Sequence, residues 1–404
     1  MKILLVHNFY GSSAPSGENS AFRAEAALLR NRGHSVTEFT RNSDELISSG
    51  AYGIMKGALG TMWNPFSLRK LRETLRETRP DIVHVHNTFP LLSPSVLYAP
   101  REFGIPTVLT LHNFRVGCSS ATALRNNEPC TLCLEQKSVL PALRYGCYRE
   151  SRLATAPIAA MIALHRTRRT WQTKVDAFIA LTEFQKKILI DYGIPEELLV
   201  VKPHFFEDPP EPLAWRRREP KVMFIGRLYE AKGAHILVDA WKQWGKKAPR
   251  LEIVGDGPMM AQLRRSIEGS DAATRITFSG TVSRDEVMTR LAKAKLLILP
   301  SLCFEGFPMA IQEAYALGVP VAASNIGSLP SIVSPGRTGA LFAPGNASEL
   351  RSAVGALFEK GRRLEQLAKN ARREFDAKYT SDRNYKDLMR IYKRAVETAK
   401  VPRS

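Results

Sequence analysis

Two glutamates, Glu305 and Glu313, stand eight positions apart around a segment that contains Gly306, Phe307 and Pro308. Carboxylate oxygens accept hydrogen bonds, and sugar hydroxyls are good donors. Pro308 suits the first turn of a helix, whose unpaired N–H groups would then face the preceding loop. Taken singly, each glutamate is equally well an ordinary helix-entry or surface acid. Taken together, they predict a site for a polyhydroxylated ligand.

Two cations follow an apolar run at 221–225, in the segment that contains Gly226, Arg227, Lys232 and Gly233. A guanidinium fork and an ammonium beside a helix N-terminus can neutralise a pyrophosphate. The two glycines would let the backbone approach such a ligand closely. The alternative is that both cations lie on the surface of a basic protein. The glycines favour the pyrophosphate site.

Two weaker signals lie in the first half of the chain. His112 ends an apolar run at 105–111 and could donate a hydrogen bond or handle a proton. Gly17 follows the first apolar run and could offer its N–H to a phosphate, although a plain turn explains it equally well. A structural histidine is the commoner case, and we expect that role for His84 and His86.

Four of the five cysteines fall in one segment, with a Cys-x2-Cys pair at its centre. Close cysteine pairs suit tetrahedral zinc, so a structural zinc is one interpretation. Reduced thiols are the favoured alternative, because the outer spacings match no common zinc motif. Cys303 is interpreted as a packing residue. The candidate zinc ligands are Cys118, Cys130, Cys133 and Cys147.

Apolar runs of strand length alternate with helical patterns through most of the chain, which is typical of parallel sheets covered by helices. The alternation stops in the proline-rich segment 205–220 and then restarts. We therefore predict an N-terminal Rossmann-like domain over 1–204, a linker over 205–220 and a second Rossmann-like domain over 221–380. A terminal helix with one apolar stripe follows over 381–404.

The composition excludes a fibrous or disordered chain, because 404 residues contain 44% hydrophobic and 24% charged residues. The net charge of +19 predicts an anionic partner, and its even spread counts against nucleic acid. Without a signal layout or a long apolar run, a cytoplasmic location is expected. The apolar and basic segment 151–174 is either a helix on the inner membrane surface or a partly buried helix.

Together these motifs resemble glycosyltransferase family 4, the retaining group 1 glycosyl transferases with the GT-B fold. That fold has two Rossmann-like, doubly wound α/β domains that face a central cleft. The match extends over nearly the whole chain and is most specific in its second half. The residues that carry the resemblance are Glu305 and Glu313 of the E-x7-E motif, Arg227, Lys232, Gly17 and His112.

The resemblance implies a role for each of these residues. Glu313 would hold the ribose of a nucleotide sugar. Arg227 and Lys232 would neutralise the leaving diphosphate, with Gly17 as a further phosphate contact. His112 would line the reaction centre, so the implied catalytic set is His112, Glu305, Arg227 and Lys232. The transferred sugar would lie against Glu305, Gly306, Phe307, Pro308 and Met309.

The implied reaction transfers a sugar, with retention of its anomeric configuration, to a saccharide or lipid-linked saccharide during cell-surface polysaccharide assembly. No catalytic cofactor is implied, and the sequence contains no Asp-x-Asp metal motif. Two alternatives are an epimerase-type GT-B enzyme, which needs acid and base groups on both faces of the sugar, and a basic membrane- or nucleic-acid-binding module. A binding module would not need a diphosphate site beside two carboxylates.

Overall fold

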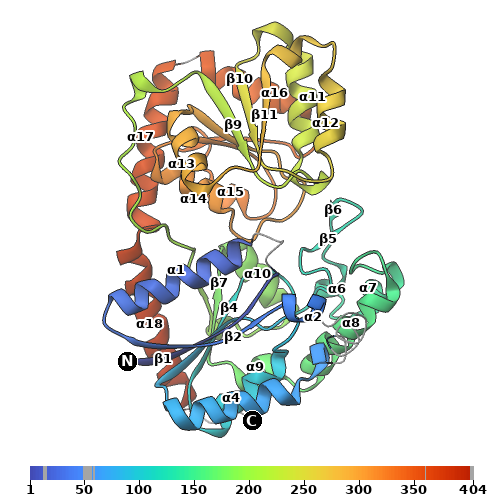
Figure 1. Cartoon of the computed structure of the whole chain (residues 1–404), viewed down its shortest axis with the longest axis vertical. Helices are drawn as coiled ribbons and strands as arrows, with labels where there is room; N and C mark the ends of the chain where they lie inside the picture. Colours follow the sequence, from blue (N-terminus) through green and yellow to red (C-terminus); the bar gives the residue numbers. More distant parts are fainter. Residues whose placement is uncertain (12–15, 49–56, 58–59, 360, 401–404) are drawn as a thin grey trace. The chain divides into compact units, whose positions relative to one another are not determined.

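The computed structural model describes residues 1–11, 16–48, 57, 60–359 and 361–400, and the chain divides into two compact units. The first unit comprises Met1–Ala123, Cys130–His204 and Asp382–Ser404, and the second comprises Leu124–Pro129 and Phe205–Ser381. Each unit contains a six-stranded parallel sheet with helices packed around it (Figure 1). The prediction of two parallel α/β domains is confirmed.

The first sheet has the strand order β2-β1-β3-β4-β7-β8. Its central strand β3 is buried along its whole length, as expected for a parallel strand covered on both faces. Ile82, Val108 and Ile179, from three neighbouring strands, belong to one apolar core. The strands are β1 (Lys2–Phe9), β2 (Ser35–Asn42), β3 (Ile82–Asn87), β4 (Thr107–Leu111), β7 (Ala177–Ala180) and β8 (Leu199–Val201).

Helix ends in this unit follow local sequence signals. The Asn64 side chain accepts hydrogen bonds from the N–H groups of Phe66 and Ser67, and Pro65 occupies the first helical position of α4. Arg79, in the left-handed region before Pro80, ends the same helix. The helices are α1 (Gly17–Asn31), α2 (Asp44–Ser48), α4 (Pro65–Thr78), α5 (Tyr98–Glu102), α6 (Leu132–Glu135), α7 (Leu140–Tyr145), α8 (Arg152–Thr167), α9 (Thr170–Lys174) and α10 (Glu183–Tyr192).

The second sheet has the order β11-β10-β9-β12-β13-β14. Trp241, fully buried, packs with Leu237 and Leu251 in the core of this unit. The strands are β9 (Lys221–Ile225), β10 (Arg250–Val254), β11 (Ile276–Gly280), β12 (Leu296–Leu299), β13 (Val321–Ser324) and β14 (Gly339–Phe342). The helices are α11 (Ala234–Trp244), α12 (Met260–Ile267), α13 (Arg284–Lys293), α14 (Met309–Ala316), α15 (Leu329–Ile332), α16 (Ala347–Glu359) and α17 (Gly361–Lys378).

The terminal helix α18 (Ser381–Ala399) belongs to the first unit, although it follows the second in the chain. Leu388, Ile391 and Tyr392, the stripe seen in the sequence, are buried against the first sheet (Figure 1). The Tyr392 hydroxyl lies 2.8 Å from Nδ1 of His84. The N-terminal domain expected over 1–204 is therefore completed by residues from the other end of the chain.

Segment 205–220, expected as a linker, belongs to the second unit. Its buried Arg218 donates hydrogen bonds to the carbonyls of Leu213, Leu317 and Gly318. Burial lowers the pKa of Arg218 to about 10. The three carbonyl acceptors hold this segment on the body of its unit.

Candidate functional site

The order of the second sheet reverses between β9 and β12, which are neighbours in the sheet but distant in sequence. In open parallel sheets, ligands bind beyond the carboxyl ends of the strands at such a reversal. The loop after β9 carries Arg227 and Lys232, and the loop after β12 carries Glu305. The topology thus brings together two motifs that are 73 residues apart, measured from Lys232 to Glu305.

Lys232 and Glu305 form a close ion pair within this reversal. The Lys232 ammonium donates to both carboxylate oxygens of Glu305, at 2.6 and 2.8 Å. The Ser301 hydroxyl donates to the same carboxylate at 2.7 Å, and the Ser328 hydroxyl donates to the backbone carbonyl of Glu305. Burial lowers the pKa of Lys232, but the neighbouring Glu305 charge outweighs it and the pKa is raised. Lys232 is therefore cationic, and Glu305 is fixed by two serines that the sequence analysis missed.

Gly233 allows the two loops to approach each other. Its φ is +70°, and a Cβ at this position would lie 1.8 Å from the carbonyl oxygen of Pro300. No side chain fits in that space, and the left-handed conformation itself favours glycine. At Gly233 the structure thus shows a close approach of two loops, and the predicted approach of the backbone to a ligand stays a prediction.

The Tyr229 side chain lies near both Arg227 and the ion pair between Lys232 and Glu305. The Arg227 guanidinium lies 5.7 Å from the centre of the Tyr229 ring. Burial raises the pKa of Tyr229, whereas the Lys232 and Arg227 charges lower it. Arg227 itself is exposed. Both predicted phosphate ligands are thus within electrostatic reach of one tyrosine ring.

Helix α14 carries Glu313, whose side chain is 14% exposed. Burial raises the pKa of Glu313, and the Arg284 charge opposes that effect from 3.6 Å. Pro308 is the N-cap of α14 rather than part of its first turn, because its ψ of 111° is extended. Met309 therefore begins the helix, while the buried Phe307 faces the Tyr379 ring at 5.6 Å.

In the first unit, His112 directly follows β4 and is only 8% exposed. Its Nε2 lies 3.1 Å from Nδ1 of His86, and its ring stacks on His204 at 5.2 Å. Burial, with the nearby His204 and His86, holds the pKa of His112 well below its usual range. His112 is therefore a neutral imidazole.

Gly17 is the exposed first residue of α1, and the Ser16 hydroxyl caps the helix by accepting from the N–H of Glu18. The Glu18 carboxylate accepts a hydrogen bond from the amide of Asn113, which follows His112. Burial raises the pKa of Glu18. Gly17, the predicted phosphate contact, therefore lies at a helix N-terminus where the N–H of Glu18 is already paired with Ser16.

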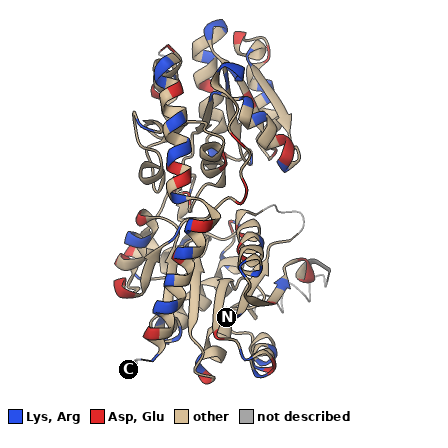
Figure 2. Ribbon diagram, turned by 90° about the vertical axis from the view of Figure 1, so that its left-hand side faces the viewer, with Lys and Arg blue, Asp and Glu red and all other residues tan. Residues whose placement is uncertain are grey.

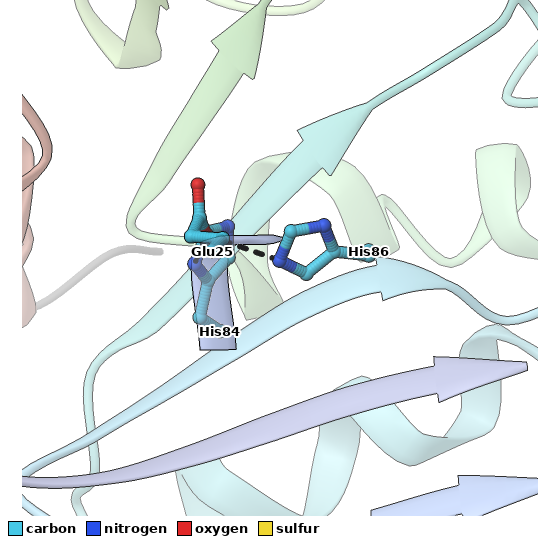
Figure 3. A group of neighbouring side chains, drawn as sticks. All are labelled: Glu25, His84 and His86. Atoms are coloured by element: carbon cyan, nitrogen blue, oxygen red, sulfur yellow. Dashed lines mark ion pairs between the residues drawn. The ribbon is translucent and has the colours of Figure 1, made fainter. Parts of the chain in front are cut away.

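His84 and His86 are buried around one carboxylate, that of Glu25 (Figure 3). Oε1 of Glu25 lies 3.0 Å from Nδ1 of His84 and 3.2 Å from Nε2 of His86. The Lys202 ammonium donates to Oε2 of Glu25 at 2.9 Å. Burial raises the pKa of Glu25, but Lys202 and the histidines outweigh it and hold that pKa well below its usual range.

The ligand types in this cluster could also hold a metal ion. Lys202 argues against that use, because its ammonium already supplies the counter-charge at Glu25. The sequence analysis missed Glu25 and Lys202. One signal was present: Glu25 lies on the buried stripe of α1 with Phe22, Ala26 and Leu29.

The four candidate zinc ligands lie in the first unit. Burial raises the pKa of the Cys133 thiol to about 11, and the nearby Cys118, Cys147 and Cys130 add to that shift. Within the described parts of the chain, the one group of three or more ligand atoms within 4.8 Å of one another is Glu25, His84 and His86. The thiols are therefore neighbours, but are not as close as the ligands of a bound zinc.

Two family profiles match the chain in succession. The family described as Glycosyltransferase Family 4 matches residues 17–207, and the family described as Glycosyl transferases group 1 matches residues 206–374. The two profiles meet at residues 206–207, close to the boundary between the two units at His204 and Phe205.

Two curated relatives and one solved structure are similar to this chain. The 2-deoxystreptamine N-acetyl-D-glucosaminyltransferase of Streptomyces fradiae is 29% identical over 74% of this chain and 67% of its own. The amylovoran biosynthesis glycosyltransferase AmsK of Erwinia amylovora is 26% identical over 51% of this chain, which spans about half of that relative (53%). The structure of Anabaena Alr3699/HepE in complex with UDP has a TM-score of 0.65 at 19% identity and covers 96% of this chain and 99% of its own.

Proposed function

Because the chain belongs to the group 1 glycosyl transferases and has the GT-B fold, we propose that it is a retaining enzyme that uses a nucleotide diphosphate sugar. The acceptor is a saccharide or lipid-linked saccharide in cell-surface polysaccharide assembly. The name of the amylovoran relative supports this assignment. The UDP in the HepE complex supports a nucleotide donor.

The ion pair between Lys232 and Glu305 is the observation that carries the proposal. It lies at the sheet reversal, where the fold favours ligand binding, and combines a cation with a hydroxyl acceptor. An ammonium has three N–H donors, of which two point to Glu305, so a phosphate oxygen can take the third. Glu305 would then hold the transferred sugar.

The remaining predicted residues complete the donor site. Glu313 would accept hydrogen bonds from the ribose hydroxyls, and Arg227 would pair with the diphosphate. The departing diphosphate gains negative charge as the glycosidic bond breaks, so fixed cations lower the barrier. A phosphate oxygen of the donor would help to take the proton of the acceptor on the same face. No metal is required for these steps.

A thermal-shift screen of nucleotides and nucleotide sugars tests the donor site. A ligand at one hundred times its Kd should stabilise the folded protein by about 2.7 kcal/mol. We expect at least one nucleoside diphosphate sugar to raise the Tm, and Glu313→Ala to abolish that rise. Glu365→Ala, which removes an exposed carboxylate of the same unit, should respond like the parent. An unchanged response of Glu313→Ala would refute the donor assignment.

We also propose that the protein contacts the surface of an anionic membrane. Helix α8 buries Ile158, Met161 and Ile162, which favours the partly buried alternative for this segment. Nevertheless, Leu140 and Leu153 are 69% and 88% exposed. The exposed cations near them in sequence are Arg144, Arg149 and Arg152. Exposed leucines beside cations suit the surface of an anionic bilayer.

Within the described residues, no helix is both long and apolar enough to cross a bilayer. Sedimentation with vesicles of phosphatidylglycerol tests the proposed surface contact. Replacing Leu140 and Leu153 with serine should reduce binding several-fold, whereas Phe66→Ser, at an exposed hydrophobic residue elsewhere in the unit, should not. Equal binding of all three proteins would refute this contact.

A structural zinc at the four cysteines also stays a proposal. The thiolate donor set suits zinc, and binding would draw the sulfurs together and release their protons. Metal analysis of purified protein should then find one zinc per chain, lost in the double variant Cys130→Ser/Cys133→Ser but kept in Cys303→Ser. Metal-free, fully folded protein would contradict the proposal.

A further inference from the structure

A cavity of about 50 Å³ lies inside the first unit, beside the carboxyl ends of β3 and β4. His86, His112 and Arg115 line one part of it, while Met161 and Trp171 come from the helices α8 and α9. A cavity needs a volume of about 10–15 Å³ to hold one water molecule. The cavity therefore holds several waters or the hydroxyl-bearing edge of a small molecule.

Four of the residues that line this cavity have a buried side-chain nitrogen without a hydrogen-bond partner among the described residues. These nitrogens are Nδ1 of His112, Nε1 of Trp171, Nε of Arg115 and Nε2 of His86. The side chains of His112 and Trp171 are 8% and 4% exposed. Leaving a buried polar atom unpaired costs about 1–3 kcal/mol. Several such nitrogens in the lining of one cavity favour a site that is completed by a polar ligand.

The Glu25 carboxylate determines how His112 is protonated. Nε2 of His86 lies 3.2 Å from Oε1 of Glu25, so a proton on that nitrogen is favoured over a lone pair facing an anion (Figure 3). When Nε2 carries the single ring proton of His86, Nδ1 is an acceptor, and its partner is Nε2 of His112 at 3.1 Å. Nε2 of His112 must donate this hydrogen bond. Nδ1 of neutral His112 is consequently left as an acceptor in the cavity.

We propose that Glu25 and His86 are positioning residues that lock the tautomer of His112, so that this cavity binds a saccharide hydroxyl with fixed hydrogen-bond polarity. The inference rests on the proposed glycosyl transfer. Nδ1 of His112 accepts the hydroxyl proton, while the N–H groups of Trp171 and Arg115 donate to the hydroxyl oxygen. A carbonyl or phosphate oxygen has no proton to give His112, so the cavity selects hydroxyls.

The tautomer is measured first, on the complete wild-type protein. With ¹⁵N-labelled histidine, two-bond proton–nitrogen NMR spectra distinguish a protonated ring nitrogen from an unprotonated one, and His112→Gln assigns the signals. We expect His112 to be protonated at Nε2 alone and His86 likewise. A proton on Nδ1 of His112, or a doubly protonated His86, would overturn the proposal. This measurement requires no substrate, and the variant is used only to assign the signals.

The second measurement uses methyl α-glucoside, methyl α-galactoside and methyl α-mannoside as probes, followed through the indole N–H signal of Trp171. We expect a saturable shift with at least one probe. His86→Leu should weaken binding at least tenfold and mix the His112 tautomers. His86→Asn, whose side-chain oxygen can replace Nδ1 as the acceptor, should stay within about threefold of wild type. Equal loss in both variants would indicate a merely structural role.

The source of the hydroxyl is resolved by kinetics with a donor from the thermal-shift screen. If the acceptor sugar occupies the cavity, Trp171→Phe should raise the KM for the acceptor and leave the KM for the donor unchanged. If the donor sugar occupies it, the same variant should raise the KM for the donor and leave the KM for the acceptor unchanged. Binding of probes without any nucleotide-sugar response would refute the proposed function and leave the hydroxyl site standing. A wild-type protein that binds no probe and shows no KM change in Trp171→Phe would refute the hydroxyl site alone.

Discussion

Glu313 illustrates, at the scale of one residue, how a buried carboxylate in a proposed binding site can lower stability. Burial raises its pKa, so the folded protein favours the protonated carboxyl more than the unfolded chain does. The resulting contribution to stability is complete below about pH 4, near the ordinary glutamate pKa, and is lost as pH rises through the higher pKa of the folded state. Arg284 offsets only part of this loss.

We therefore expect Glu313→Gln to be as stable as the parent near pH 4 and more stable at pH 8. Each kcal/mol should raise the Tm of a unit of this size by about 2–4 °C. Calorimetry across this pH range measures the difference, with Glu365→Gln as the exposed control. A Tm difference that shrinks as pH rises would contradict the assignment. The same variant should lose its response to the nucleotide sugar.

Residue spacing was sufficient to propose the carboxylates and cations of a donor site, because each motif lies in one loop and its helix. Spacing could not predict that Ser301 and Ser328 would hold Glu305, since serines have many local roles. It also could not find Glu25 with Lys202, which are 177 residues apart. A glutamate on the buried stripe of a helix indicates only that its carboxylate must have a partner.

At the scale of elements, the proposed donor site requires the loop after β9 to lie close to the loop after β12. Gly233→Ala should push the Pro300 carbonyl away and separate Lys232 from Glu305. Gly269→Ala is a matched control in the same unit, since Gly269 has the same φ of +70° and nothing within 4 Å of an added Cβ. The control should cost about 1–2 kcal/mol, the ordinary penalty of a left-handed conformation.

We expect Gly233→Ala to be less stable than this control and to lose the nucleotide-sugar response, while Gly269→Ala keeps that response. Thermal unfolding with and without the ligand measures both effects. If the two variants behave alike, the approach of the loops has no role in binding.

The alternation of apolar runs predicted both sheets, because parallel strands buried on both faces leave a strong signal. The alternation did not define helix boundaries: α11 begins at Ala234 after a short 3-10 turn that ends at Lys232. Figure 2 shows Lys and Arg spread over elements of both units, in agreement with the even charge of the sequence. Short helices such as α7 and α9 gave no periodic signal, since fewer than two turns cannot define an apolar face.

At the scale of the whole molecule, the two ends of the chain stabilise one unit. The sequence predicted the apolar stripe of α18 but not the surface that it covers, because a single stripe fits any apolar face. In the structure, Leu388 and Tyr392 complete the core around Ile3 and Ile82. The Asn384 side chain also accepts a hydrogen bond from Lys202, the ion-pair partner of Glu25. The last helix is therefore continuous with the buried network behind His112.

Leu388→Ala should consequently destabilise the N-terminal unit, although the substitution lies beyond residue 380. Removing this buried side chain should cost about 2–5 kcal/mol. Hydrogen exchange should show lost protection in β1 and β3 with little change in β9 and β12, because the sheets have separate cores. Leu367→Ala, in the core of the second unit, should give the reverse pattern. Loss of protection in both sheets from either variant would mean that the two units unfold as one.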